Sequence, residues 1–392
     1  MWIWKKAVTG VLALLLVLGG LSLPTAAVIT DVPSVYPPIV SAQSAVLMEA
    51  ESGDVILGIS EDTPLPMAST TKIMTALVAL QLASPETVIT VDPQAVNVEG
   101  SSIYLTEGET LTLEQLLYAI LLESANDAAM AIAIGTAGSV EAFAEQMNQT
   151  AAALGLSHSH FVNPHGLDAE EHYTTAHDLA LIARTALQNE LLKTIMSTKK
   201  ATIPHAGTDS SRLLVNHNKL LRAYEGCIGV KTGFTKRSGR CLVSAAEREG
   251  VTLIAVTLNA PDDWNDHTAL LDFGFSQYRA VELCREGEFL LPLSIVGGTD
   301  AYVMVSNQAP LSRVLPTQAG EISFVVELPR FAYAGLSAGE EVGCVRFFCD
   351  TNGDGSKEPI GEVPLTSCYG VEQYVKTNRF LQWLKGLFGF LK

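Results

Sequence analysis

The sequence is poor in basic residues. It has 25 Lys and Arg against 42 Asp and Glu, which gives a formal net charge of −17 and a pI near 4.9. A nucleic-acid-binding protein needs a basic surface, so this balance argues against a nucleic-acid partner. The chain is 48% hydrophobic and has 392 residues. At roughly 150 residues per domain it can form two or three folded units, each with a sizeable core.

Cysteines are few, and common metal and nucleotide motifs are missing. The six cysteines allow only three disulfides, which a core of this size does not need. Cys344 and Cys349 lie in one strand-like run at an odd spacing, so we expect no bridge between them. Free core cysteines and other pairings both stay open. No CxxC, HExxH or P-loop motif occurs, so no zinc, nucleotide or other cofactor is expected.

An apolar run lies near the N-terminus. Two lysines precede the run Ala7–Gly20, and small residues follow it up to Ala27. This order is typical of a secretory signal peptide, so we predict a signal over residues 1–27 and a linker over 28–40. The alternative is an uncleaved membrane anchor, for which the run is barely long enough. Either interpretation places the rest of the chain outside the cytoplasm.

The middle of the chain alternates between strand and helix patterns. Short strand-like runs come first, helical periodicity dominates next, and strands then return before a last helix. The predicted segments are strands Ala45–Glu49 and Val55–Ile59, helices between Ser69 and about Leu192, strands Ile228–Lys231, Cys241–Ala246 and Leu253–Leu258, and a helix over Asp263–Tyr278. The pattern predicts one α+β domain over residues 41–285, whose first and last strands meet beneath a helical cluster.

The C-terminal part differs in character. Residues 286–370 carry short strand candidates separated by Gly, Pro and Asn, which predicts a small all-β domain, of the β-sandwich kind. The strand candidates are Phe289–Leu291, Tyr302–Val305, Ile322–Leu328 and Val342–Phe348.

The tail, residues 371–392, predicts an amphipathic helix in a membrane interface. Its basic residues lie opposite an apolar face formed by Phe380, Trp383, Leu384, Leu387, Phe388 and Leu391. The alternative is a helix packed on the β domain or on a partner.

Three short motifs carry the chemistry. In Ser69-Thr-Thr-Lys72 the Ser and Lys share one helix face, so the amine can activate the hydroxyl. Alone this motif is weak, because it is expected roughly once in a chain of this size. Ser124-Ala-Asn126 places two polar residues between apolar helical stretches, as a structural joint or part of a cleft. Lys231-Thr-Gly233 on a strand offers a cation and a hydroxyl to a carboxylate.

Together and in this order, the motifs resemble those of the penicillin-binding proteins and serine β-lactamases. The segments Phe161–Leu167, Thr174–Asp178 and Ile228–Thr235 narrow the resemblance to D-alanyl-D-alanine carboxypeptidases of the penicillin-binding protein 5 type. It covers essentially the whole chain. It implies a β-lactamase/transpeptidase-like α+β catalytic domain with an antiparallel sheet, followed by the all-β domain and the amphipathic helix.

The resemblance also implies an activity. Ser69 would attack the bond between the two terminal D-alanines of a peptidoglycan stem peptide and form an acyl-enzyme. Lys72 would accept the proton, Ser124 would relay it to the leaving amine, and Asn126 would hold the substrate and Lys72. β-Lactam antibiotics would inhibit by forming a stable acyl adduct. The enzyme would act at the outer face of the cytoplasmic membrane or in the cell wall, in part secreted.

The third motif would bind the substrate. Lys231 and Thr232 would hold the terminal carboxylate, and Gly233 would let the substrate backbone approach the strand. The oxyanion hole would be the backbone N–H groups of Ser69 and Phe234.

Alternatives remain on the same fold. A D,D-endopeptidase would use the same residues, and a non-catalytic penicillin-binding scaffold would have no chemical need for them. A β-lactamase resembling class A would need an E-x-x-L-N setting, whereas Glu170 and Glu171 lie in EEHYT. Two other patterns are weaker: Gly335–Gly339 fits a nucleophile elbow without a later His, and Asp350–Gly355 resembles a calcium loop but is better explained as a hairpin turn.

Overall fold

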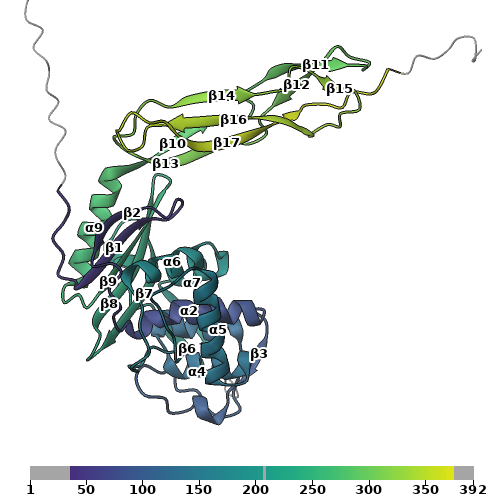
Figure 1. Cartoon of the computed structure of the whole chain (residues 1–392). Coiled ribbons are helices and arrows are strands. Elements are labelled where there is room, and N and C mark those ends of the chain that lie inside the picture. The colour runs from purple at the N-terminus through teal and green to yellow at the C-terminus, as the bar shows by residue number, and fades with distance from the viewer. Residues whose placement is uncertain (1–35, 206–208, 375–392) are drawn as a thin grey trace, which may run out of the picture. The chain divides into compact units, whose positions relative to one another are not determined.

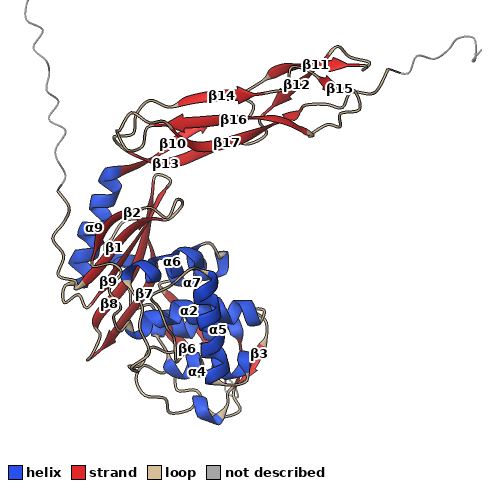
Figure 2. Cartoon of the chain, viewed as in Figure 1, coloured by secondary structure: helices blue, strands red, loops and turns tan. Residues whose placement is uncertain are grey.

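The computed structural model describes residues 36–205 and 209–374 (Figure 1). Contacts divide the chain into a short unit, residues 1–36, and a large unit, residues 37–392. Within the large unit, a mixed helix and sheet region precedes an all-strand region (Figure 2).

An antiparallel five-stranded sheet forms the centre of the mixed region. Its strands, in spatial order, are β2 (Val55–Ile59), β1 (Ser44–Glu49), β9 (Val251–Leu258), β8 (Gly239–Arg248) and β7 (Cys227–Thr235). β1 pairs with β9 along its whole length, from Ser44 opposite Leu258 to Glu49 opposite Leu253. The prediction that the first and last strands meet is confirmed. Because β7 has a neighbour on one side only, one of its edges is free to line a site.

Side-chain alternation along the strands builds two separate cores, one on each face of the sheet. On β1, Val46 and Met48 belong to the core beneath the helical cluster, whereas Leu47 belongs to the core on the other face. Helix α9 (Asp263–Gln277) supplies Leu270 and Leu271 to this second core. The sheet therefore lies between α9 and the larger group of helices.

The helical cluster is less continuous than the periodicity predicts. Its elements are η2 (Ala68–Thr71), α2 (Lys72–Leu82), η3 (Pro93–Ala95), α3 (Leu113–Tyr118), the π-helical turn η4 (Ala119–Glu123), α4 (Asn126–Ala137), α5 (Val140–Ala153), α6 (Ala176–Leu187), α7 (Glu190–Ser197) and, before β7, α8 (Leu220–Ala223). Two small hairpins interrupt this part of the chain: β3 (Val88–Thr90) with β4 (Thr110–Thr112), and β5 (Lys200–Pro204) with β6 (Ser211–Val215). The capping box at the start of α3 is present, with Thr112 and Gln115 bonding reciprocally.

As far as residue 374, where the description ends, the elements of the second region are all strands, as predicted. β10 (Tyr278–Cys284) pairs with β13 (Leu311–Pro316). A six-stranded sheet has the order β14 (Ser323–Glu327), β16 (Glu341–Cys349), β17 (Glu358–Ser367), β12 (Tyr302–Ser306), β11 (Leu291–Val296) and β15 (Ala332–Tyr333). The strand expected at Phe289–Leu291 begins only at Leu291, because the backbone N–H of Phe289 donates to the Asn307 side chain at 3.0 Å.

All six cysteines are free, so Cys344 and Cys349 do not bridge, as expected. Within residues 36–205 and 209–374, no helix has the length and apolar character needed to cross a membrane. The predicted signal peptide and the apolar face of the predicted tail helix lie outside the described residues.

Candidate active site

The first motif forms the turn that starts helix α2. Ser69 lies in η2 and Lys72 is the first residue of α2, so the 3-10 turn brings the two side chains together. Lys72 Nζ lies 3.0 Å from Ser69 Oγ, and the lysine side chain is completely buried. Burial, and next the nearby Lys231 ammonium, hold the pKa of Lys72 well below its usual value. This arrangement provides a buried amine beside a hydroxyl.

Lys72 is held from two further sides. Its Nζ donates to Asn126 Oδ1 at 2.7 Å and to the carbonyl oxygen of His165 at 2.6 Å. Asn126 is itself fixed, because its Nδ2 donates to the Glu99 carbonyl at 2.6 Å. These contacts fix the direction of the amine towards Ser69.

Ser124 is placed by a backbone reversal between two helical segments. It follows the turn η4 in the left-handed conformation, with φ 62°, and α4 begins two residues later. The reversal brings Ser124 to the wall of a cavity and Asn126 to Lys72. The second motif is therefore a joint between helices and also part of a cleft, which are the two interpretations that its sequence allowed.

The third motif lies on the edge strand β7. Lys231 Nζ donates to the Thr232 carbonyl at 2.9 Å, and burial lowers the pKa of Lys231 to about 7 against the raising effect of the Glu123 carboxylate. A Cβ at Gly233 would lie 3.1 Å from the backbone nitrogen of Ser69, tighter than ordinary contacts. Gly233 thus lets β7 approach the turn that carries Ser69.

The three motifs meet at one cavity of about 360 Å³. Its walls come from separate parts of the sequence: Ser69, Ser101, Ser124, His217, Lys219, Thr232, Gly233, Phe234, Arg240, Asp263 and Trp264. Lys72, Asn126 and Lys231 lie behind this wall and are buried. Every predicted site residue therefore lies on this cavity or directly behind it.

A buried hydrogen-bond chain supports the backbone beside Ser69. Ala68 has a positive φ of 49°, and the Thr71 hydroxyl donates to its carbonyl at 2.7 Å. The Val162 N–H donates to His172 Nδ1 at 3.1 Å, so the neutral ring carries its proton on Nε2 and donates it to the Thr71 oxygen at 2.9 Å. Burial first, and then His160 and Lys72, lower the pKa of His172 to about 4, which keeps the ring neutral at pH 7.

Several site residues were not identified from the sequence. Asp127 accepts from Ser102 Oγ at 2.6 Å and from the backbone N–H groups of Ile103 and Leu105, and so anchors the loop that brings Ser101 to the cavity. Arg240 bonds Asp263 at 2.8 Å and also lies over the Trp264 ring. No local pattern marks these residues, since the cavity wall is assembled from distant segments. The Asn-Pro dipeptide in Asn163-Pro-His-Gly166 is typical of a turn and could have predicted the turn at His165.

The weaker patterns do not form sites of their own. Ser337 lies in the connection between β15 and β16 and is followed by a strand where a nucleophile elbow needs a helix, so it lacks that geometry. Asp350 accepts from the backbone N–H groups of Gly353 and Gly355 and closes the β16–β17 hairpin, as expected. Within the described ranges, no group of His, Cys, Asp and Glu side chains could hold a metal ion.

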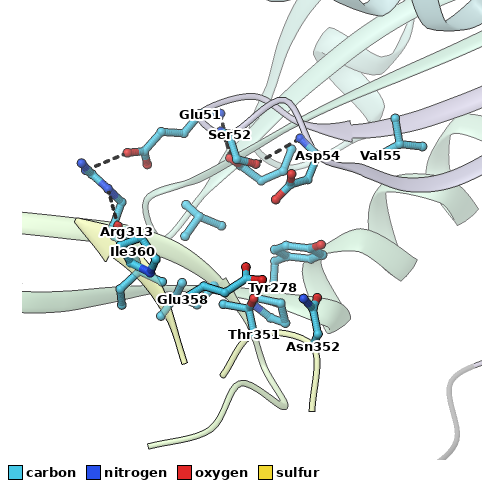
Figure 3. Close-up of a pocket in the computed structure, with 15 residues that line it drawn as sticks. Glu51, Ser52, Asp54, Val55, Tyr278, Arg313, Thr351, Asn352, Glu358 and Ile360 are labelled. Atoms are coloured by element: carbon cyan, nitrogen blue, oxygen red, sulfur yellow. Dashed lines mark hydrogen bonds and ion pairs between the residues drawn. The ribbon is translucent and has the colours of Figure 1, made fainter. Parts of the chain in front are cut away.

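A second, larger cavity of about 670 Å³ lies elsewhere (Figure 3). Glu51, Asp54, Tyr278 and Glu358 are among its lining residues, and Arg313 bonds Glu51 there at 3.0 Å. None of the three motifs contributes a residue to it. The three motifs therefore make the smaller cavity the candidate active site.

Comparisons with known proteins agree with this geometry. The family model described as D-alanyl-D-alanine carboxypeptidase matches residues 31–262. The D-alanyl-D-alanine carboxypeptidase DacF of Bacillus subtilis is 31% identical over 360 residues, which cover 89% of each chain. DacA of Escherichia coli, with the same description, is 32% identical over 344 residues, 82% of each chain.

Solved structures give the same result. The structure of penicillin binding protein 5 from Haemophilus influenzae has a TM-score of 0.65 and 26% identity, and the match covers 86% of this chain and all of that one, 100%. The structure of DacD from Francisella tularensis has a TM-score of 0.61 and 26% identity over 86% and 95% of the two chains. The chain belongs to the D-alanyl-D-alanine carboxypeptidase family, hydrolases of the penicillin-binding class that act on the cell wall.

Proposed function

We propose that this protein is a serine carboxypeptidase in which Ser69 attacks the peptide bond between the two terminal D-alanines of a peptidoglycan stem peptide. The observation that carries this proposal is the 3.0 Å separation of Lys72 Nζ and Ser69 Oγ in a buried site. A neutral lysine has two N–H donors and one lone pair. Both donors have acceptors, at Asn126 Oδ1 and the His165 carbonyl, so the lone pair is directed at the serine proton.

Acylation follows from this arrangement. Lys72 takes the proton of Ser69 Oγ as the oxygen bonds to the carbonyl carbon of the penultimate D-alanine. The oxyanion that forms is stabilised by the backbone N–H groups of Ser69 and Phe234. The carbon–nitrogen bond then breaks, and the leaving D-alanine amine receives a proton through Ser124. The products are an ester on Ser69 and free D-alanine.

Deacylation reverses the direction of proton transfer. Water attacks the ester carbonyl, its proton passes to Lys72, and Ser69 leaves with a proton restored to its oxygen. Lys231 and Thr232 hold the substrate's terminal carboxylate during acylation, with Gly233 giving room for the substrate backbone. Asn126 binds the substrate backbone as well as Lys72. A β-lactam acylates the same serine, and its ring-opened adduct persists because its leaving group stays attached.

One experiment distinguishes carboxypeptidase activity from an endopeptidase, a β-lactamase and a non-catalytic scaffold. The purified protein and Ser69→Ala are incubated with a fluorescent penicillin and with diacetyl-Lys-D-Ala-D-Ala. We expect an adduct on Ser69 by intact mass, and D-alanine release that the substitution abolishes. An adduct without D-alanine release would favour the endopeptidase or the scaffold. Rapid penicillin turnover would favour a β-lactamase, against which the exposed positions of Glu170 and Glu171 outside the cavity already argue.

We also propose that the protein is exported and held at the outer face of the cytoplasmic membrane. The order of residues in 1–27 supports export, and the apolar face of the tail, from Phe380 to Leu391, supports membrane attachment. Protease added to intact cells should digest the protein, whereas a cytoplasmic control protein should survive. Survival of the protein in intact cells would contradict export.

A further inference from the structure

Exposed aromatic side chains gather at one end of the all-strand region. Tyr302, Phe331, Tyr333, Tyr369 and Tyr374 are each between 40% and 71% exposed, and Val296 among them is 47% exposed. These six residues are called the aromatic tip below. A chain of this size has cores large enough to bury such side chains. A cluster of exposed aromatic rings is therefore a candidate interaction surface.

Strand pairing places these residues on one outward face. Val296 of β11 is opposite Tyr333 of β15, and Ser294 of β11 is opposite Tyr302 of β12. Since side chains alternate along a strand, residues 294 and 296 point the same way, away from buried Leu293 and Ile295. Tyr302 and Tyr333 therefore share that outward face.

Two further aromatic residues of the tip, Phe331 and Tyr369, contact the residues on this face. Phe331 contacts Tyr333 with ring centroids 5.5 Å apart. The Tyr369 hydroxyl donates to the Tyr302 carbonyl at 3.5 Å. The aromatic tip thus combines residues of three strands, β11, β12 and β15, with residues of the segments beside them.

The chain leaves the described structure at this same place. The backbone N–H of Tyr374 donates to the Gly297 carbonyl at 2.8 Å, next to Val296. Figure 1 shows β11, β12 and β15 at the end of the sheet where the described chain ends. Residues 375–392, which follow directly, carry the apolar and basic side chains of the predicted membrane-binding tail. Any surface bound by the start of this tail is therefore close to the aromatic tip.

The side chains of the aromatic tip indicate which kind of surface it binds. Tyr is favoured at the boundary between lipid headgroups and acyl chains, because its ring is apolar and its hydroxyl stays hydrated, and Phe adds an apolar ring that can enter the same boundary. Asp300 and Glu372 lie beside the tip, in a chain of net charge −17. Attraction to anionic lipids therefore cannot explain binding by the tip, and insertion of the rings can.

We propose that the aromatic tip is a second membrane contact, which inserts its rings into the interface of a phospholipid bilayer beside the tail. This proposal rests on the proposed attachment of the tail to the membrane. Its consequence is two attachment points, one on the all-strand region and one in the tail, so the all-strand region is oriented on the bilayer and not merely tethered to it.

The test measures binding of the full mature chain to phosphatidylcholine vesicles, which offer no net charge to the basic tail. The tip variant combines Tyr302→Ser, Phe331→Ser and Tyr333→Ser. The matched control combines Phe324→Ser and Val325→Ser on β14, the opposite edge strand of the same sheet. We expect the tip variant to partition about tenfold more weakly and the control to equal the parent. Both should retain D-alanine release from soluble peptide.

Further measurements distinguish membrane insertion of the tip from its alternatives. In hydroxyl-radical footprinting, vesicles should protect Tyr333 and Tyr302 but not Phe324. A tip variant that binds as the parent does, while Trp383→Ser loses binding, would overturn the proposal and leave the tail attachment standing. A parent chain that binds no vesicle would overturn both. The parent chain could also form dimers in sedimentation that the tip variant no longer forms, with vesicle binding unchanged. That result would assign the tip to contact with a second copy of the chain and would overturn the proposal.

Discussion

At the scale of single residues, the proposed mechanism depends on two buried lysines that need opposite charge states. Lys72 must be neutral to accept the serine proton, and burial together with Lys231 lowers its pKa. Lys231 must be charged to bind a carboxylate, yet burial lowers its pKa to about 7. The two titrations are coupled, because a charged Lys231 favours the neutral form of Lys72.

We predict a bell-shaped pH profile for kcat/KM on a D-Ala-D-Ala peptide. Activity should rise with pH as Lys72 loses its proton, and fall as pH increases through about 7, where Lys231 loses its charge. In Lys231→Arg the guanidinium stays charged, so the alkaline limb should move up by more than one pH unit even where peak activity is lower. Stopped assays of D-alanine release between pH 5 and about 10, for the parent and for Lys231→Arg, measure the two profiles. An alkaline limb unchanged by the substitution would exclude Lys231 as its source.

Thr71 should act as a positioning residue for Ser69. Thr71→Val removes the donor to the Ala68 carbonyl and leaves the buried His172 Nε2–H without its acceptor, at a cost of ~1–3 kcal/mol. We expect acylation by penicillin to slow by about tenfold, whereas Thr71→Ser, which keeps the hydroxyl, should stay near the parent rate. The second-order acylation rate and the melting temperature together provide the test. Equal rates for both variants, after matching for stability, would mean that the hydroxyl only supports folding.

At the scale of elements, a buried histidine joins helix α9 to the sheet. His267 on α9 bonds Ser244 of β8 through Nδ1, and its Nε2 bonds Thr257 of β9 at 2.9 Å. The ring is fully buried, and burial lowers its pKa to about 3. The helix is therefore attached by polar bonds as well as by the Leu270 and Leu271 core.

This attachment makes stability depend on pH. Between pH 6.5 and about 3, the unfolded chain binds a proton on His267 that the folded chain does not bind. The free energy of unfolding should therefore decrease as pH falls through this window, by at most ~5 kcal/mol from this residue. In His267→Gln the pH dependence should be shallower, although stability at pH 7 is lower. Urea unfolding at several pH values measures both, and parallel curves would contradict the assignment.

At the scale of the whole molecule, an acidic chain carries a basic tail. Arg379, Lys385 and Lys392 lie in the last residues of a protein of net charge −17. The cavity that carries the chemistry is built entirely from the mixed region, from Ser69 to Trp264. The proposed membrane attachment and the candidate active site therefore reside in different parts of the chain.

Deletion of residues 375–392 should separate these two properties. We expect the shortened protein to move from the membrane fraction to the soluble fraction, because the apolar face of the tail is lost. Its kcat/KM on soluble peptide should stay within about twofold of the parent, since no site residue is removed. Fractionation of cells and a D-alanine release assay measure the two effects. A deletion that leaves the protein on the membrane would show that other segments suffice for attachment.

Much of the fold was predictable from local patterns. Alternation and turn residues predicted the hairpin of β1 and β2, and the Thr112 to Gln115 spacing predicted the start of α3, because these features depend on neighbours in sequence. The helical periodicity did not reveal the π-helical turn η4 or the left-handed Ser124. Both depend on packing that fits Ser124 against the cavity, which no local propensity encodes.

The sequence by itself determined the family, the order of the three motifs and the candidate catalytic residues, because covalent spacing fixes which side chains share a turn or a strand. Tertiary structure alone decided the rest. It brought the His165 carbonyl to Lys72 and completed the cavity wall with Arg240 and Trp264. It also gathered the aromatic tip from three strands and the segments beside them. These contacts join residues far apart in the chain, and their geometry is set only when the sheet and helices pack.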